Sequence, residues 1–238
     1  MMIEVKGISK SFGKQKVLEE INVNIKKGEM FGLLGPSGAG KTTLIRLITG
    51  AEAVDKGEIL VDSRPVPNFQ TLKTIGFMPQ NDGLYPEISG YDNLHFFGGL
   101  FGLRGQELED AIARNLKLVD LTQDAKKLVG KYSGGMRKRL SLAAALIHSP
   151  EVLILDEPTV GIDPLLRRKI WEEFKHQQAM GRTIIVTTHV MDEIKYCDRA
   201  GLIYEGNLIA CDTVDKLTEL GQGSIENLFF NIPLRERG

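Results

Sequence analysis

The chain has 238 residues, of which 42% are hydrophobic and 26% are charged, and its formal net charge is −1. These values are typical of a folded globular protein with a sizeable core, and they exclude a disordered chain and a strongly basic one, so we expect no nucleic-acid partner. The two cysteines, Cys197 and Cys211, are too few for a disulfide framework or a cysteine metal cluster, and they fit a reducing cytoplasm.

The N-terminal residues MMIEVKGISK lack the apolar core of a signal peptide. No stretch of the chain approaches the roughly 20 apolar residues that a membrane span requires. Any work at a membrane must therefore go through a partner. Because the sequence shows no internal repeat, low-complexity segment or long linker, we expect a single domain over residues 1–238.

Four segments have the patterns of β-strands. Residues 21–29, INVNIKKGE, alternate apolar and polar side chains, which predicts a half-exposed antiparallel strand. Residues 30–35 (MFGLLG), 151–158 (EVLILDEP) and 182–189 (RTIIVTTH) are nearly continuous in apolar residues, as are strands buried on both faces of a parallel sheet. Each of these three runs ends in Gly, Asp, Glu or His. Because open α/β sheets bind ligands outside the carboxyl ends of such strands, we expect the three ends to share one crevice.

The residues 35–42, GPSGAGKT, match the phosphate-binding pattern G-x-x-x-x-G-K-[ST]. They lie between an apolar strand and a predicted helix, TTLIRLITG, a context that argues against a chance glycine-rich turn. In such a loop the backbone amides close around phosphate oxygens, Lys41 reaches the β- and γ-phosphates, Thr42 binds Mg²⁺ and Thr43 can add a phosphate contact. The candidate nucleotide-binding residues are Gly35, Pro36, Ser37, Gly38, Ala39, Gly40, Lys41, Thr42 and Thr43.

Between about residues 84 and 150 the pattern becomes helical, which predicts a helical subdomain inserted into the sheet core. Its last helix follows Ser133 and two glycines and carries three cations, 137–139, in its first turn. Cations there oppose the helix macrodipole, at a cost of roughly 0.3–1 kcal/mol each when exposed. The run is either a solvated basic turn or a helix start that receives an anion. The predicted apolar face consists of Met136, Leu140, Ala143 and Ile147.

Two carboxylates and a histidine end the later apolar runs. We expect the Asp156 carboxylate to face Mg²⁺. The adjacent Glu157 side chain should point in another direction, toward an attacking water, for which it would act as the general base. The alternative is that both carboxylates only cap the next helix. His189 ends a strand at the same sheet edge, where it could bond the γ-phosphate and hold the water and Glu157. The histidines interpreted as structural are His95, His148 and His176.

The C-terminal part of the sequence has the pattern of further sheet structure, and we predict no catalytic or binding residues there. Residues 201–210, GLIYEGNLIA, have the pattern of a hairpin that turns at Glu205-Gly206-Asn207. For the tail, residues 224–238, we predict only packing.

Together these motifs resemble those of the ATP-binding cassette (ABC) ATPases, over nearly the whole chain. GPSGAGKT is similar to the Walker A motif, VLILDEP to Walker B with its following glutamate, YSGGM to the family signature and GIDP (161–164) to the D-loop. His189 matches the switch histidine, and Gln80 in GFMPQ matches the Q-loop glutamine. The signature between the Q-loop and Walker B makes the resemblance specific. It implies an α/β fold: a P-loop NTPase core with a mixed sheet, an antiparallel β flank and an inserted α-helical subdomain.

The resemblance also implies the cofactors ATP and Mg²⁺ and further site residues. Phe12 in KSFG matches the aromatic residue that stacks on adenine, with Val17 nearby, and Gln80 would sense Mg²⁺ or water. Asp163 belongs to the D-loop and joins the nucleotide-binding set. Glu157 and His189 are the candidate catalytic residues, and the candidate metal ligands are Thr42, Gln80 and Asp156.

The same resemblance implies that two cassettes pair head-to-tail, with the signature of one subunit facing the γ-phosphate bound by Lys41 of the other. The second subunit's ATP is then the anion received by the helix after Ser133, Gly134 and Gly135. Tyr132 and Met136 replace the outer residues of the commonest signature, Leu-Ser-Gly-Gly-Gln. Such variants resemble the drug- and antibiotic-export branch.

We therefore expect an ATP-hydrolysing exporter subunit, paired with an identical or paralogous cassette and bound to a separately encoded transmembrane permease at the cytoplasmic face of the membrane. Residues 81–97 match the groove for the permease's coupling helix, although their aromatics could equally be core. A soluble cassette ATPase acting in cluster assembly, repair or translation is the alternative. A P-loop kinase or GTPase would leave the signature and His189 unexplained.

Overall fold

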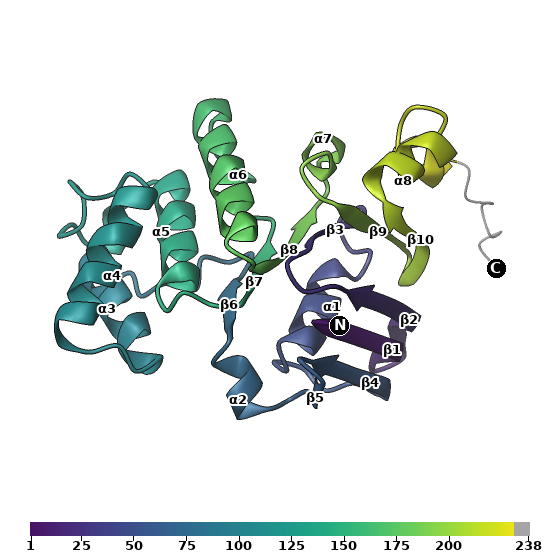
Figure 1. Ribbon diagram of the computed structural model, residues 1–238, viewed down its shortest axis with the longest axis horizontal. Helices are drawn as coiled ribbons and strands as arrows, with labels where there is room; N and C mark the ends of the chain where they lie inside the picture. The colour runs from purple at the N-terminus through teal and green to yellow at the C-terminus, as the bar shows by residue number, and fades with distance from the viewer. Residues whose placement is uncertain (231–238) are drawn as a thin grey trace.

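A six-stranded mixed sheet forms the centre of the structure, a computed structural model that describes residues 1–230 (Figure 1). The strand order is β10-β9-β3-β8-β7-β6, and every neighbouring pair is parallel except β9 with β10. The mixed sheet predicted from the sequence is confirmed. Its strands are β3 (Met30–Leu34), β6 (Ile75–Met78), β7 (Val152–Asp156), β8 (Thr183–Thr188), β9 (Arg199–Tyr204) and β10 (Asn207–Thr213).

An antiparallel sheet flanks this core, in the order β2-β1-β4-β5. The alternating segment 21–29 overlaps its edge strand β2, whose residues from Glu20 to Ile25 alternate between exposed and buried, as predicted. The strands of this sheet are β1 (Ile3–Phe12), β2 (Gln15–Ile25), β4 (Lys56–Val61) and β5 (Arg64–Pro65).

The three apolar runs form the adjacent strands β3, β8 and β7, and every residue within these strands is buried. Their parallel register pairs Leu34 with Thr188 and Asp156 with Thr187, so the three carboxyl ends meet at one edge of the sheet. The three strand ends therefore lie close enough together to line the one crevice that the sequence predicts.

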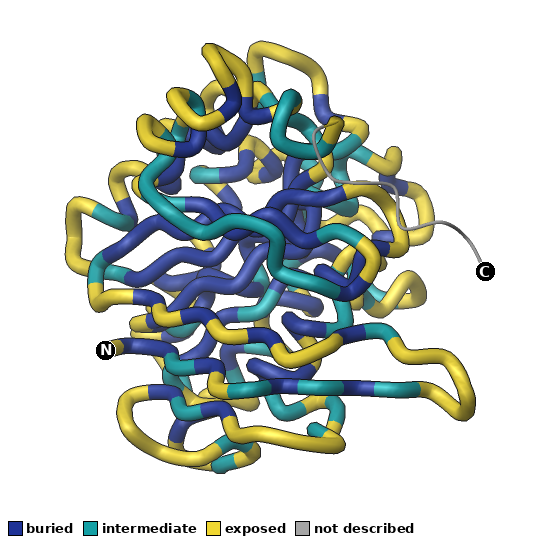
Figure 2. Tube along the Cα trace, turned by 90° about the vertical axis from the view of Figure 1, so that its right-hand side faces the viewer, coloured by how far each residue is buried: buried dark blue, intermediate teal, exposed yellow. Residues whose placement is uncertain are grey.

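The two faces of these strands enter different cores. In β7 and β8, Ile154 and Ile185 pack with helix α1 (Lys41–Ile48) and the antiparallel sheet, whereas Leu153 and Ile184 pack with helices α5 (Gly134–Leu146) and α6 (Pro164–Ala179). Figure 2 shows the buried strands running through the interior between exposed loops. Side chains alternate across a strand, so a continuous apolar run fits a strand covered on both faces.

Between β6 and β7 the chain is helical, and α3, α4 and α5 gather at one end of the molecule (teal, Figure 1). The helical insertion is thus confirmed, while the bounds 84–150 and the single domain 1–238, which includes residues outside the described 1–230, remain predictions. The helices are α1 (Lys41–Ile48), α2 (Phe69–Leu72), α3 (Gly90–Leu100), α4 (Gly105–Leu118), the 3-10 helix η1 (Val129–Lys131), α5 (Gly134–Leu146), α6 (Pro164–Ala179), α7 (Met191–Ile194), α8 (Val214–Leu220) and α9 (Asn227–Phe230). Among residues 1–230, none of the helices has the length and apolar content needed to cross a membrane.

Helix α5 buries the face that its periodicity predicts. Leu140, Ala143 and Ile147 are buried in the core, and Met136 packs against it. Ser133 is the N-cap, and its Oγ accepts a hydrogen bond from the Met136 amide at 3.2 Å. The side-chain cap satisfies an amide that would otherwise lack a partner at the helix start.

The C-terminal hairpin is also confirmed. Glu205 and Gly206 both have positive φ, 45° and 77°, as the common two-residue hairpin turn requires, and Asn207 begins β10. Of the tail, residues 231–238 lie outside the described part of the chain.

The Gly76→Ala substitution is expected to lower the free energy of unfolding by roughly 1–3 kcal/mol. A Cβ at Gly76 in β6 would lie 2.2 Å from the Ala145 carbonyl oxygen and 2.7 Å from Pro150 Cγ, so the strand and helix α5 must move apart. Urea-induced unfolding measures the change. The control is Gly99→Ala in α3, where the new Cβ meets only Arg104 Nη1, at 3.5 Å, and stability should be unchanged or higher. Equal stability of Gly76→Ala and the wild type would contradict this interpretation.

Candidate active site

The phosphate-binding sequence forms the turn between β3 and α1. Gly38 and Gly40 have φ of 81° and 109°, the left-handed region that glycine adopts without strain. Gly40 is the N-cap of α1 and supplies no side chain to the first amides of the helix. A Cβ at Gly38 would meet nothing within 4 Å, so the outer face of the loop is open. A glycine-rich turn ahead of a helix with uncapped amides is suited to bind phosphate.

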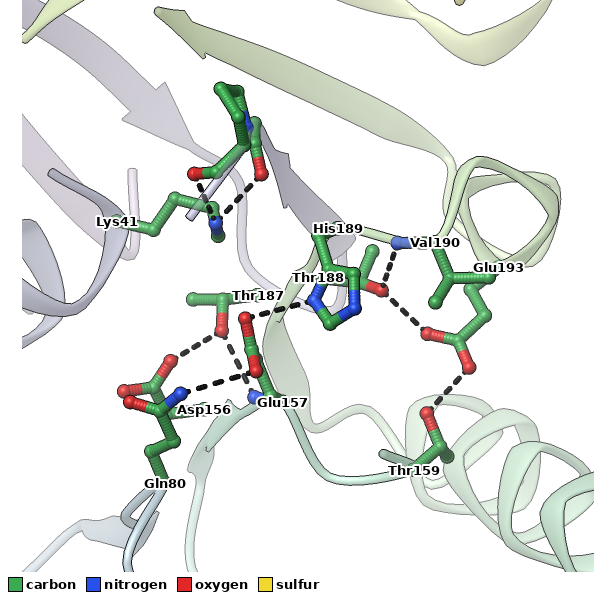
Figure 3. Close-up of polar contacts among 12 residues, drawn as sticks. Lys41, Gln80, Asp156, Glu157, Thr159, Thr187, Thr188, His189, Val190 and Glu193 are labelled. Atoms are coloured by element: carbon green, nitrogen blue, oxygen red, sulfur yellow. Dashed lines mark hydrogen bonds and ion pairs between the residues drawn. The ribbon is translucent and has the colours of Figure 1, made fainter. Parts of the chain in front are cut away.

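Lys41, the first residue of α1, is buried against this loop. Its Nζ donates hydrogen bonds to the carbonyl oxygens of Gly35 at 2.7 Å and Pro36 at 3.0 Å. Burial lowers the pKa of Lys41, and the carboxylates of Glu157 and Asp156 oppose this shift. The ammonium thus lies between the loop and the carboxylates at the end of β7 (Figure 3).

Asp156 ends β7 as a buried carboxylate with 1% exposure. The Thr187 hydroxyl of the neighbouring β8 donates a hydrogen bond to Asp156 Oδ1, and its oxygen accepts one from the Glu157 amide at 3.0 Å. Thr187 therefore orients both carboxylate residues. Thr187 was not predicted from the sequence, because its register opposite Asp156 depends on the pairing of β7 with β8.

Glu157 lies between the ends of two other strands (Figure 3). Gln80, after β6, donates from Nε2 to Glu157 Oε2 at 3.2 Å, and His189 Nδ1, after β8, lies 3.1 Å from Glu157 Oε1. Glu157 has a φ of 53°, which is uncommon for a residue with a side chain and is concentrated at functional sites. The structure thus brings three predicted site residues together, two of them in direct contact with the carboxylate.

The proposed adenine contacts lie on the neighbouring β1–β2 hairpin. Phe12 is 45% exposed, with Lys10 Nζ 5.1 Å from its ring centre, and Val17 is partly buried. A Cβ at Gly40 would lie 2.6 Å from Leu18 Cδ2 and 3.0 Å from the Val17 carbonyl oxygen. Val17 and Leu18 of the hairpin therefore pack directly against the phosphate loop, and Phe12 on the same hairpin has an exposed ring.

Ser133 and Gly134 are exposed at the start of α5, and Gly135 is half-buried. Figure 1 shows α5 well apart from α1, on the other side of β6 and β7. Within residues 1–230, no hydrogen bond joins Ser133–Gly135 to the loop 35–42. One copy of the chain therefore separates its two predicted phosphate-binding elements.

The signature departures have structural explanations. Tyr132 is buried, its hydroxyl donates to the Asp124 carbonyl oxygen at 2.7 Å, and burial raises its pKa. Met136 packs against the helical core rather than presenting a polar side chain. Both residues thus anchor α5 within the insertion.

Two of the three cations at the start of α5 already have partners. Arg137 Nε contacts Asp82 Oδ2 at 3.0 Å, and its Nη1 donates to the Tyr132 carbonyl oxygen at 2.9 Å. Arg139 Nη1 donates to the carbonyl oxygens of Val119 and Asp120 at 2.8 and 2.9 Å. The charges of Arg137 and Arg139 are therefore explained by internal contacts, which leaves Lys138 and the serine and glycines before it for the anion interpretation.

Asp163 is the N-cap of α6, where its Oδ1 accepts from the Leu166 amide at 3.0 Å. This contact gives it a structural role at the D-loop. His148 stacks on Phe101 with 3.5 Å between ring centres, and burial lowers its pKa to about 4. It is a neutral packing residue at neutral pH, in line with its sequence interpretation.

The fold and the site define the class of protein: a P-loop enzyme, with a phosphate loop after β3 and a Glu–His–Gln cluster at the ends of β7, β8 and β6. The family profile described as ABC transporter matches residues 18–160. The chain is 42% identical over 232 residues to the linearmycin resistance ATP-binding protein LnrL of Bacillus subtilis, covering 95% of this chain and 74% of that protein. The chain belongs to the ABC transporter family.

Two further relatives are longer than this chain. It is 46% identical to the Nod factor export ATP-binding protein I of Sinorhizobium fredii over 87% of its own length and 61% of that protein. It is 40% identical to the probable multidrug ABC transporter ATP-binding protein YbhF of Escherichia coli over 91% of its length and 38% of that protein.

Solved structures match the whole fold. An ATP-binding subunit of an ABC transporter superimposes with a TM-score of 0.89 at 27% identity, covering 97% of this chain and 98% of the other. A dimeric ATP-binding cassette in a post-hydrolysis state, bound to ADP and Pi, superimposes with a TM-score of 0.83 at 25% identity, covering 90% and 99%. The chain is thus an ATP-binding subunit of the family, and its hydrolysis of ATP is coupled to transport.

Proposed function

We propose that this chain drives an exporter of drug-like or antibiotic-like molecules. The observation that best supports ATP hydrolysis by this chain is the position of Glu157 between Gln80 and His189, at the same sheet edge as the phosphate loop. The direction of transport is supported by the relatives, whose names describe linearmycin resistance, Nod factor export and multidrug transport.

The residues of the loop 35–42 hold the phosphates of ATP in this proposal. Backbone amides of the glycine-rich turn and Lys41 neutralise phosphate charge, and Phe12 stacks on the adenine beside Val17. The exposed ring of Phe12 and the open face at Gly38 support this arrangement. Thr43, half-buried in the first turn of α1, adds a phosphate contact.

The donor set at the sheet edge fits Mg²⁺. Asp156 supplies a carboxylate, Thr42 a hydroxyl and Gln80 an amide oxygen, all hard oxygen donors. Within residues 1–230, no cluster of three or more His, Cys, Asp or Glu side chains could hold a metal by itself, and Mg²⁺ is commonly bound by one or two carboxylates together with substrate phosphates. When bound, Mg²⁺ neutralises charge on the transferred phosphoryl group.

Glu157 is the proposed general base, which accepts a proton from the attacking water. Its two contacts orient the carboxylate: Gln80 donates to one oxygen, and His189 lies against the other. The Glu157 carboxylate contacts Gln80 and His189, whereas the Asp156 carboxylate accepts from Thr187, and these different surroundings support different roles.

A second cassette completes the site. The exposed Ser133 and Gly134, with Gly135, bind the γ-phosphate held by Lys41 of the other subunit, so ATP favours the closed dimer and hydrolysis removes the bridge. The separation of the two elements within one chain supports this proposal (Figure 1). The dimer described for the solved cassette supports it as well.

A transmembrane permease is the proposed membrane partner, and it holds the chain at the cytoplasmic face. The segment 81–97 presents a cluster of aromatic rings, with Tyr85 and Phe96 5.0 Å apart and Phe96 and Phe97 5.4 Å apart. Tyr85 is 46% and Phe96 40% exposed. An exposed aromatic cluster is suited to hold an inserted helix.

The test of this function is purification of the tagged chain from gently solubilised membranes of its native cell. We expect a stoichiometric polytopic membrane protein to accompany it. Recovery in the soluble fraction alone, with soluble partners, would support the alternative of a soluble cassette ATPase and leave the ATPase chemistry unaffected. The Tyr85→Ala variant should lose the membrane protein, whereas Phe69→Ala, at an exposed phenylalanine outside the segment, should retain it.

A further inference from the structure

Glu193 in α7 is a buried carboxylate, 3% exposed, that the proposed catalysis does not use. Its two oxygens accept hydrogen bonds from two hydroxyls: Thr159 donates to Oε1 at 2.5 Å, and Thr188 donates to Oε2 at 2.6 Å (Figure 3). Hydrogen bonds to a charged acceptor are roughly twice as strong as neutral ones. Glu193 is therefore held firmly from two sides.

The two threonines belong to different parts of the site. Thr159 lies in the loop from β7 to α6, between Glu157 and Asp163, whereas Thr188 ends β8 directly before His189. Thr188 Oγ1 also accepts the Val190 amide at 2.9 Å, so residues on both sides of His189 are joined to Glu193. The carboxylate thus links the segment of the general base to the turn that carries the histidine.

Arg167 of α6 strengthens the same link. Its Nε lies 3.9 Å from Glu193 Oε1, and its Nη2 donates to the Ile162 carbonyl oxygen at 3.3 Å, in the loop that also contains Thr159. A buried charge is costly unless it has partners, and here the partners are hydroxyls on the two segments next to Glu157 and His189 and a guanidinium on α6.

We propose that Glu193 is a positioning residue, which fixes the β7–α6 loop to the His189 turn so that the imidazole lies against the Glu157 carboxylate. The proposal rests on the proposed function, in which Glu157 and His189 act on the water. Glu193 itself does not touch the reacting atoms. Its removal should impair the chemical step through His189 and leave the nucleotide contacts of the loop 35–42 in place.

The test measures kcat and KM for ATP in Glu193→Ala, His189→Ala and the double variant. We expect Glu193→Ala to lower kcat about tenfold or more with KM changed by less than about twofold, and to cause no further loss in the His189→Ala background. The matched control is Glu172→Ala, an exposed carboxylate on α6 paired with Arg168, which should keep the wild-type rate.

A milder pair of variants separates positioning from folding. Thr159→Val preserves the shape of the side chain and removes one donor to Glu193, whereas Thr159→Ser keeps the hydroxyl. We expect Thr159→Val to lower kcat severalfold without a change in KM. Thr159→Ser should have the kcat of the wild type. Equal rates for Thr159→Val and the wild type would overturn the proposal.

Two further outcomes are distinguishable. If His189→Ala lowers kcat and the effect of Glu193→Ala multiplies with it independently, Glu193 does not act through the histidine, and the positioning proposal fails alone. If His189→Ala hydrolyses ATP at the wild-type rate, the proposed role of His189 fails, and the positioning proposal fails with it.

Discussion

Glu157→Gln is expected to lower the steady-state rate of ATP hydrolysis by about 10²–10⁴-fold while leaving ATP binding intact. Glutamine has the shape of glutamate and can still accept the hydrogen bond from Gln80, but its amide cannot take a proton from water. The effect should therefore fall on kcat. Because hydrolysis no longer removes the γ-phosphate, ATP should trap the variant as a dimer.

Phosphate release measures the rate, and size-exclusion chromatography with and without ATP measures the dimer. The matched control is Glu151→Gln, an exposed glutamate directly before β7 that pairs loosely with Lys27, and its rate should equal that of the wild type. A Glu157→Gln variant that hydrolyses ATP at the normal rate would remove Glu157 from the role of base.

Mixing Lys41→Ala with Gly135→Asp is expected to restore ATP hydrolysis that neither variant has alone. Lys41→Ala lacks the ammonium of its own phosphate loop, and Gly135→Asp places a carboxylate where the partner's γ-phosphate would lie. A head-to-tail heterodimer then has one site with both defects and one site with neither. Random mixing should recover about a quarter of the wild-type rate. A Cβ at Gly135 meets only the Gly161 carbonyl oxygen, at 3.9 Å, so this variant should fold.

The control pair is Lys41→Ala with Glu157→Gln. Both residues lie at the same sheet edge of one chain, so a heterodimer has no intact site and should stay inactive. Two different affinity tags verify that heterodimers form in both mixtures. No recovery in the first mixture, once its heterodimers are verified, would mean that the signature serves the ATP of its own chain. Recovery in the control would mean that Lys41 and Glu157 of one chain do not act on the same ATP.

Much of the site is predictable from the sequence because each of its motifs lies within a short stretch of the chain. The pattern 35–42 lies within one turn, and its strand and helix flank it directly, so spacing alone identifies it. The buried runs are equally local, since a strand covered on both faces must be apolar at every position. The helical face of α5 follows from the same kind of periodicity.

The partners of individual side chains were not predictable in this way. Arg137 of the cationic run pairs with Asp82, and Tyr132 of the signature reaches the Asp124 carbonyl oxygen. Neither pairing leaves a pattern in the sequence, because each depends on how the helical insertion packs rather than on residues close by in the chain.

By itself, the sequence predicted the candidate residues for the chemistry: the phosphate loop, the two carboxylates after one strand and the histidine after another. The sequence also predicted that Glu157 and His189 meet at one sheet edge. Only the tertiary structure decided that Gln80 donates to Glu157, that Thr187 accepts from the Glu157 amide and that Glu193 accepts from Thr188. The physical reason is the order of the strands. Hydrophobic periodicity indicates which faces of a strand are buried, but hydrogen bonding between strands decides which strands are neighbours. In this sheet β7 lies between β8 and β6, so strand ends that are far apart in the sequence lie at one edge.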